Sequence, residues 1–260
     1  MKYSLMTWNT ELYIYGNKGK DGELMADIKH ADYPSIKSKI NTFLMSNENA
    51  IVLLNEWPYK CNCTDDYHVF FSDFYREKNE DYKHKMIFNV YEDVKNQIKM
   101  NVVLANEGLI DKVSDGLNSN IFVTFELMGT DIRVLSAHPH DAVELYNSLV
   151  DLDKMGKPMP DIIVGDLNSG IYTKVKESIE FKENRCHYRK VLKEFGYKDA
   201  CRGEMTRRYI FDNGYQYYTP IDHILIKEDT LNNFKCDDVM VSQDYSLSDH
   251  CPISFNIITG

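Results

Sequence analysis

Cysteine is scarce in this sequence, with 6 residues in 260. The cysteines form no C-x-x-C pair, which is the usual spacing of structural zinc ligands. Small secreted domains that depend on disulfides are far richer in cysteine. These absences disfavour both a zinc framework and a disulfide scaffold, and we expect the thiols to be reduced.

Long hydrophobic runs are also absent. No stretch reaches the roughly 18 apolar residues that a membrane-spanning helix requires. The N-terminal segment MKYSLM leads directly into a strand-like pattern and lacks the apolar core of a signal peptide. We therefore expect a cytoplasmic protein without a membrane span.

Positive charge is in deficit, because 30 Lys and Arg residues stand against 40 Asp and Glu residues, a formal net charge of -10. Non-specific binding of nucleic acid depends largely on neutralisation of phosphates by Lys and Arg. The composition therefore disfavours a protein that coats nucleic acid. Carboxylates gathered in a cleft would also repel a phosphate until a cation neutralises them, so an acidic protein that acts on phosphates should depend on a metal.

Apolar runs of strand length recur along the chain and predict many β-strands. Each run is bounded by polar or turn residues. The runs are 3–8, 51–54, 69–71, 101–105, 121–127, 132–137, 162–164, 221–226, 239–241 and 253–258. The segment 73–99 is highly charged and weakly patterned, and we interpret it as a surface excursion.

Three helical patterns lie between these runs. The clearest begins at Pro34, a favoured first-turn residue, and places apolar residues on one face, namely Ile36, Ile40, Phe43 and Leu44. The second spans about 141–154, with Asp141 as its N-cap, and the third spans about 184–195. Strands mixed with helices predict a mixed α/β fold. We expect a single domain over residues 1–260, because a chain of this length can bury one core.

Polar side chains recur at the points where predicted strands end. They are Asn9, Glu56, His138, Asp166, Asn168, Asp222, Asp249 and His250. Ligands of sheet proteins gather at strand ends, so we expect these side chains to converge on one cleft. The oxygen donors Glu56, Asp166 and Asp249 suit Mg²⁺ or Mn²⁺, which retain waters and accept substrate phosphate. The two histidines suit a charged donor and an imidazole oriented by a carboxylate.

The same residues carry a family resemblance. The motifs occur in the order Trp8-Asn9, Asn55-Glu56, Ser136-Ala137-His138, Gly165-Asp166-Leu167-Asn168, Ile221-Asp222-His223 and Ser248-Asp249-His250. Each is weak alone, but their order over nearly the whole chain resembles the endonuclease/exonuclease/phosphatase superfamily. The resemblance implies a four-layer α/β sandwich, in which two packed mixed β-sheets are flanked by helices.

The resemblance also implies roles for the motif residues. Glu56 matches the metal-binding glutamate and Asn9 its neighbouring asparagine, while Asp249 assists metal binding. Asp166 matches the aspartate that activates or positions the attacking water, and Asn168 the asparagine that orients the phosphate. Asp222 and His250 match the hydrogen-bonded pair at the scissile phosphate.

His138 lies where the pancreatic-type, deoxyribonuclease-I-like branch carries a second histidine, which favours a nuclease. Two departures disfavour the abasic-site repair branch. Thr219-Pro220-Ile221 precedes Asp222 where repair nucleases commonly have Arg-Ile, and Leu167 replaces a frequent Phe.

Arg207 and Arg208 precede the Asp222 strand, where the family often places a loop that faces substrate, and we predict phosphate contact for both. The predicted function is therefore metal-dependent hydrolysis of DNA or RNA phosphodiester bonds by a monomeric enzyme. A phosphodiesterase or phosphatase on a small or lipid-linked phosphate, sphingomyelinase-like or inositol-phosphatase-like, is the alternative. A catalytically silent binding protein is a third reading, which the retention of Glu56, Asp166 and His250 disfavours.

Overall fold

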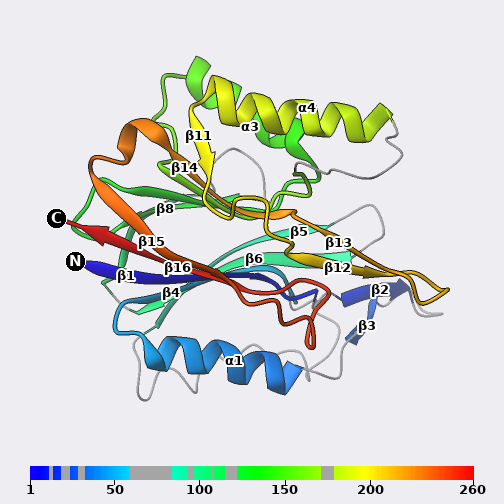
Figure 1. The fold of residues 1–260 in the computed structure, drawn as a ribbon. Helices are drawn as coiled ribbons and strands as arrows, with labels where there is room; N and C mark the ends of the chain where they lie inside the picture. The colour runs from blue at the N-terminus through cyan, green and yellow to red at the C-terminus, as the bar shows by residue number, and fades with distance from the viewer. Residues whose placement is uncertain are drawn as a thin grey trace.

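The structure is a computed structural model that describes residues 1–11, 14–18, 24–28, 33–58, 84–92, 97–106, 108–114, 122–170 and 179–260. Two large sheets dominate it (Figure 1). The first, sheet A, has the order β15-β16-β1-β4-β6-β2-β3, with β5 also paired to β6. Its strands are β1 (Lys2–Asn9), β2 (Ile14–Lys18), β3 (Leu24–Ile28), β4 (Ala50–Pro58), β5 (His84–Glu92), β6 (Gln97–Asn106), β15 (Phe234–Val241) and β16 (Ile253–Thr259).

The second sheet, sheet B, has the order β11-β14-β10-β9-β8-β7. Its strands are β7 (Ile110–Ser114), β8 (Phe122–Leu127), β9 (Arg133–Ala137), β10 (Ile162–Asp166), β11 (Tyr197–Asp199) and β14 (Asp222–Lys227). A separate hairpin joins β12 (Arg207–Ile210) to β13 (Gln216–Thr219). Both large sheets are mixed, because β1 runs parallel to β4 and β9 runs parallel to β10.

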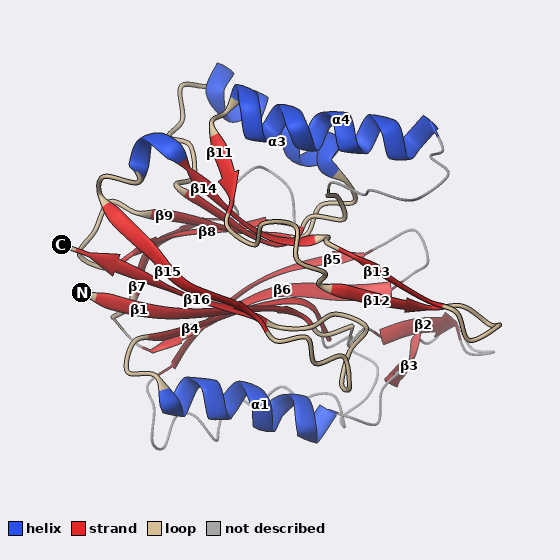
Figure 2. Ribbon diagram, in the orientation of Figure 1, coloured by secondary structure: helices blue, strands red, loops and turns tan. Residues whose placement is uncertain are grey.

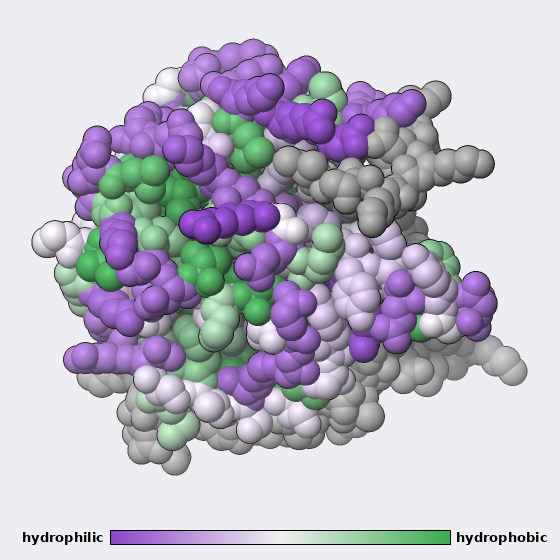
Figure 3. Space-filling model, in the orientation of Figure 1, coloured by the Kyte–Doolittle hydropathy of each residue, from purple (hydrophilic) through white to green (hydrophobic). Residues whose placement is uncertain are grey.

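Helices cover the outer faces of the two sheets and complete four layers. Helix α1 (Tyr33–Ser46) lies against sheet A, whereas α3 (Ala142–Lys154) and α4 (Ile179–Glu194) lie against sheet B (Figure 2). A short 3₁₀ turn, η1 (Glu228–Thr230), follows β14. In the space-filling view, hydrophilic residues dominate the outer surface over α3 and α4 (Figure 3). The layers are those of the predicted four-layer sandwich.

Apolar periodicity explains how each layer packs. Ile36, Ile40 and Leu44 of α1 are buried against sheet A, as their helical spacing predicts. Helix α3 begins where expected, because the Asp141 carboxylate accepts a hydrogen bond from the Glu144 amide.

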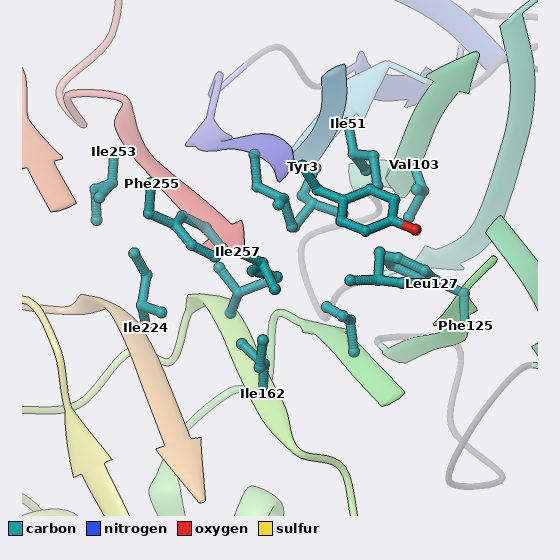
Figure 4. Close-up of a cluster of buried hydrophobic side chains, with 14 of the residues drawn as sticks. Tyr3, Ile51, Val103, Phe125, Leu127, Ile162, Ile224, Ile253, Phe255 and Ile257 are labelled. Atoms are coloured by element: carbon teal, nitrogen blue, oxygen red, sulfur yellow. The ribbon is translucent and has the colours of Figure 1, made fainter. Parts of the chain in front are cut away.

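Between the sheets, alternate side chains of facing strands form the central core (Figure 4), which includes Tyr3, Ile51, Phe125, Ile162 and Phe255. Burial of an aliphatic or aromatic side chain contributes about 1.5–3 kcal/mol, so this layer fixes how the two sheets face each other. This packing holds in place the strand ends that carry the polar residues.

The predicted strands are confirmed wherever they fall on described residues. The run 69–71 lies outside the described residues. The interpretation of 73–99 as a surface excursion is wrong at its C-terminal end, because β5 and the start of β6 form a paired hairpin there. The third helix begins earlier than residue 184, at Ile179. Among the described residues, no helix is long and apolar enough to cross a membrane.

Candidate active site

Sheet A positions Asn9 and Glu56 at one edge. The parallel pairing of β1 with β4 places Asn9 opposite Asn55. Between Leu54 and Trp57, the pairing of β4 with β6 shifts its register. Glu56 lies in this shifted segment and has a φ of 52°. Such a left-handed conformation is strained for glutamate, and a bulge re-aims the side chains around it. The Glu56 carboxylate then lies 3.5 Å from His138 Nε2.

Sheet B brings Asp166 and Asp222 to the facing edge. Asp166 ends β10 and pairs in register with Asp222, which begins β14. Gly165 precedes Asp166 with a φ of 134°, and a Cβ atom there would overlap the Ala137 carbonyl oxygen. Glycine is therefore required for the close approach that places Asp166. His138 follows the end of β9, the parallel neighbour of β10.

The carboxylate of Asp166 lies at the centre of the site and is only 2% exposed. Its Oδ2 accepts a hydrogen bond from Asn9 Nδ2 at 3.0 Å. The same oxygen lies 3.5 Å from His138 Nε2 and 3.8 Å from His250 Nε2. Its Oδ1 accepts from the Asn168 amide at 2.8 Å. The structure thus brings together residues from four separate strand ends around one carboxylate.

His250 is held by a buried carboxylate. Its Nδ1 lies 2.8 and 3.0 Å from the two oxygens of Asp222. Its Nε2 faces Asp166 and lies 3.5 Å from Asp249 Oδ1. Burial alone would lower the pKa of His250, but Asp222, Asp249 and Asp166 together raise it to about 10. The ring is therefore an imidazolium at neutral pH, with its Nε2 proton available beside Asp166.

The surrounding cations keep Asp166 ionised. Burial would raise the pKa of this carboxyl, but the positive charge of His250, His138 and Arg207 outweighs burial and lowers it below its usual value. A carboxylate of this kind accepts hydrogen bonds strongly and orients a donor such as water.

Asp249 pairs with Arg207 at the rim of the site. Arg207 Nε donates to Asp249 Oδ2 at 2.8 Å. The other oxygen, Oδ1, is buried and has no hydrogen-bond partner among the described residues. A buried carboxylate oxygen without a donor is costly unless another ligand satisfies it.

Among the residues that the structure describes, the charges of the cluster do not balance. Its carboxylates are Glu56, Asp166, Asp222 and Asp249, and full positive charges come from Arg207 and the His250 imidazolium. The four carboxylates outnumber these cations even when His138 is counted with them, and a divalent cation would offset the excess negative charge. The excess charge, the unsatisfied Asp249 oxygen and the oxygen-rich donor set all fit Mg²⁺ or Mn²⁺.

A tighter group of possible ligands consists of Asp166, Asp222 and His250, whose nearest donor atoms lie within 4.8 Å of one another. Both nitrogens of His250 already face carboxylates and carry protons, so this ring cannot ligate a metal in the present arrangement. This group is better described as a buried ion-pair cluster. The oxygen donors on the Glu56 and Asp249 sides suit a cation better.

Asn168 stabilises the loop that follows β10. It adopts a φ of 49°, which asparagine tolerates better than most residues. Its Nδ2 donates to the Pro139 carbonyl at 3.0 Å, which ties the Asp166 loop to the His138 loop. Asn184 of α4 donates in turn to the Asn168 carbonyl. In this arrangement Asn168 holds two loops together at the site.

Three contributing residues were not assigned roles from the sequence. Asn55 Oδ1 accepts from the Asp166 amide at 3.0 Å, which bridges the two sheets. Its position as a buried amide in an otherwise apolar strand was a usable signal. The Thr206 hydroxyl accepts from the Asp222 amide at 2.9 Å. Glu11, two residues beyond Asn9, lines a cavity of about 340 Å³ together with Asp249.

Arg207 and Arg208 have different partners in the structure, although phosphate contact was predicted for both from the sequence. Successive residues of a strand point to opposite faces. Arg207 turns toward Asp249, whereas an Arg208 guanidinium nitrogen donates to the Tyr245 carbonyl at 2.8 Å. Arg208 lines the cavity beside Asp249 but does not enter the Asp166 cluster.

A second buried ionic network lies behind the site. His223 Nδ1 lies 3.1 Å from Asp199 Oδ2 and 3.0 Å from the Tyr188 hydroxyl, and its Nε2 lies 2.5 Å from the Ser169 carbonyl. Nε2 faces a carbonyl and therefore donates, and the Asp199 carboxylate beside Nδ1 raises the pKa of the ring and favours its imidazolium form. The network ties β14 and α4 to the loop that carries Asn168.

This network makes stability depend on pH. Burial would lower the pKa of His223, but Asp199 raises it above 6.5, so the stability that His223 contributes is full below pH 6.5 and is lost as pH rises through the raised pKa. Burial would raise the pKa of Asp199, but His223 lowers it below 3.8, so its contribution is lost in acid. We expect Asp199→Asn to lower the free energy of unfolding by about 3 kcal/mol between about pH 4 and 6.5, and by less at higher pH.

Urea unfolding over a pH series measures this difference. The matched control is Asp229→Asn, which removes a carboxylate that is 67% exposed and pairs with Lys227. It should change the free energy of unfolding by no more than about 0.5 kcal/mol at any pH. An equal loss at every pH for Asp199→Asn would contradict a charged His223.

Comparisons with known proteins identify the fold. No protein-family model matches the sequence, and no curated protein matches it. Solved structures do match. The endonuclease domain of TRAS1, a telomere-specific non-LTR retrotransposon, is 17% identical with a TM-score of 0.59, over 98% of each chain. A 3'-5' exonuclease from Neisseria meningitidis is 14% identical with a TM-score of 0.60, over 97% of this chain and 98% of that one.

The AP endonuclease LMAP from Leishmania major is 13% identical with a TM-score of 0.64, over 100% of this chain and 88% of that one. At such identities the likeness concerns the fold. It extends to an AP endonuclease and to a retrotransposon endonuclease domain alike, so it does not separate the branches of the superfamily. The order of the motifs and the layers agree with it. The chain has the fold of the endonuclease/exonuclease/phosphatase superfamily, as its strand-end motifs predict.

Proposed function

We propose that this protein is a divalent-metal-dependent phosphodiesterase that hydrolyses nucleic acid. The observation that carries the proposal is the arrangement around Asp166. The buried, ionised carboxylate of Asp166 lies within 4 Å of Nε2 of the His250 imidazolium and of Nε2 of His138. It belongs to a cluster in which negative charge is in excess. Such a cluster provides an acceptor for water beside a donor for an anionic group.

In the proposed reaction, water attacks phosphorus and loses a proton to solvent. The ester bond opposite the water breaks, and the leaving oxygen departs with the bonding electron pair and takes up a proton. Asp166 accepts a hydrogen bond from the water and aims its lone pair, while Asn9 and Asn168 hold the carboxylate in that orientation. The His250 imidazolium, fixed by Asp222, donates from Nε2 to a phosphate oxygen that gains charge in the transition state. His138 Nε2 lies 3.5 Å from Asp166 Oδ2, the same oxygen that His250 Nε2 faces, and is the second donor.

The cation would be held by Glu56 and Asp249. The amide oxygen of Asn9 would be a further ligand. One of its lone pairs accepts a hydrogen bond from the Glu11 amide, and the second would face the cation. A divalent cation at such a site neutralises the anionic substrate and polarises a phosphoryl oxygen. Arg207 remains at the rim, where its guanidinium can contact a phosphate while it pairs with Asp249.

Nucleic acid is proposed as the substrate because the three structural neighbours described above are a retrotransposon endonuclease domain, an exonuclease and an AP endonuclease. The position of His138 favours the same reading. A small or lipid-linked phosphate could use the same central residues, so the substrate has to be tested directly. The single domain, the monomeric state and the cytoplasmic location stay predictions.

An activity screen tests the proposal. We expect the protein with Mg²⁺ to hydrolyse at least one of plasmid, single-stranded DNA and RNA, and to leave a sphingomyelin analogue and inositol phosphates intact. Hydrolysis of only the lipid or inositol substrates would overturn the nuclease assignment. Inactivity on every substrate, with a folded protein and Mg²⁺ present, would overturn the assignment of an enzyme.

A further inference from the structure

The β12–β13 hairpin exposes an aromatic surface. Tyr209, Ile210, Phe211, Tyr215 and Tyr218 are each 39–62% exposed. The Tyr209 and Phe211 rings lie 4.8 Å apart edge to face, and the Phe211 and Tyr215 rings lie 5.8 Å apart. The hairpin extends to the right edge of the molecule in Figure 1, and the surface over it is mainly pale in Figure 3. A cluster of exposed apolar rings of this kind marks a binding surface.

This surface is continuous with the candidate active site. Arg207, the first residue of β12, bonds to Asp249 and forms an isolated bridge with His250. The backbone amide of Arg208 also donates to the Asp249 carbonyl at 2.7 Å. Phe211 lies four residues farther along, or ~14 Å at ~3.4 Å per residue. A polymer with a phosphate at His250 would therefore run its neighbouring units along the hairpin.

Charge indicates how this surface would hold a nucleic acid. The hairpin segment 205–219 contains the two arginines, Asp212 and no lysine. Arg207 is paired with Asp249 and Arg208 with a carbonyl, and the whole chain carries a net charge of -10. Duplex binding depends on neutralisation of many phosphates, for which this surface has few free cations.

Stacking offers the other source of affinity. The face of a base is available to an aromatic ring only where the strand is unpaired. We propose that Tyr209, Phe211 and Tyr215 stack on unpaired bases next to the scissile phosphate and so direct the enzyme to single-stranded nucleic acid. This inference rests on the proposed function and names the form of its substrate.

Binding is measured by fluorescence anisotropy with a fluorescein-labelled 12-nucleotide oligothymidine and with a labelled 12-base-pair duplex. We expect the triple variant Tyr209→Ala, Phe211→Ala, Tyr215→Ala to lose at least about tenfold in affinity for the oligothymidine. Its affinity for the duplex should change less than twofold, and its salt slope should stay the same, because no phosphate contact is removed. Circular dichroism verifies folding.

Two matched variants sharpen the test. Replacing the same three residues by leucine keeps apolar area but removes the ring faces, so affinity for the oligothymidine should fall as in the alanine variant. Met240→Ala removes a side chain that is 62% exposed on β15, outside the hairpin, and should bind as wild type. Wild-type affinity in the leucine variant would overturn the inference, and so would an equal loss on the duplex.

A membrane-binding hairpin is the competing outcome. If phosphatidylcholine vesicles bind the wild type, and the alanine variant loses that binding while it retains affinity for oligothymidine, the inference is overturned. Hydrolysis of bis(p-nitrophenyl) phosphate by the wild type with Mg²⁺ tests the proposed function separately. If the wild type hydrolyses this substrate and the alanine variant still binds oligothymidine as the wild type does, the hairpin inference is rejected and the proposed function stands.

Discussion

Asp166→Asn and His250→Ala should each lower turnover on the best nucleic acid substrate by roughly 10² or more. Asp166→Asn removes the negative charge that orients water and leaves an amide beside the His250 imidazolium. His250→Ala removes the donor to the phosphate and leaves Asp222 buried without its partner. Single-turnover rates measure both effects, with circular dichroism to verify folding.

The two residues should act as a unit, because His250 Nε2 lies 3.8 Å from Asp166 Oδ2. The double variant should then lose far less than the product of the two single losses. His187→Ala, on α4 and hydrogen-bonded to a backbone carbonyl there, is the control and should keep the wild-type rate. A folded single variant with nearly the wild-type rate would place the chemistry elsewhere.

Removal of divalent cations should abolish hydrolysis, and Mg²⁺ or Mn²⁺ should restore it. The physical reason is that carboxylates outnumber cations among the described residues of the site, so that an anionic substrate is repelled unless a metal cation is bound. Zn²⁺ should serve less well, since the donors are oxygens. The measurement is the rate after exhaustive dialysis against a chelator, followed by titration with each metal.

Variants of the proposed ligands separate a metal effect from a general loss. Glu56→Gln and Asp249→Asn should each raise the Mg²⁺ concentration needed for half-maximal rate, and isothermal titration calorimetry should show weaker Mg²⁺ binding by the protein alone. Asp229→Asn, which changes an exposed carboxylate in η1 beyond the end of β14, should leave both quantities unchanged. Full activity after complete chelation would refute the metal assignment.

Much of the fold could be predicted because its signals are local. The alternation and length of apolar runs indicate strands such as β1, β4 and β16, and the Asp141 cap indicates where α3 begins. The strand β5 was missed because the segment 73–99 was judged as a whole, and the charged residues on either side outweighed the apolar run Met86–Phe88. Its pairing with β6 over nine residues is a contact between segments, which no single-segment pattern reveals.

The sequence by itself determined that polar donors follow successive strands and that the motifs occur in one family's order. Parallel pairing of β1 with β4, and of β9 with β10, makes such strand ends meet. For this reason Asn9, Glu56, His138 and Asp166 could be expected in one place.

Only the tertiary structure decided which hydrogen-bond partner each polar side chain has. Arg207 and Arg208 are adjacent in sequence, yet strand alternation sends one to Asp249 and the other to the Tyr245 carbonyl. The imidazolium of His223 and the bridging role of Asn55 likewise depend on atoms far away along the chain. Hydrogen bonds are short and directional, so these partners are fixed by the packing of the two sheets and their loops in three dimensions.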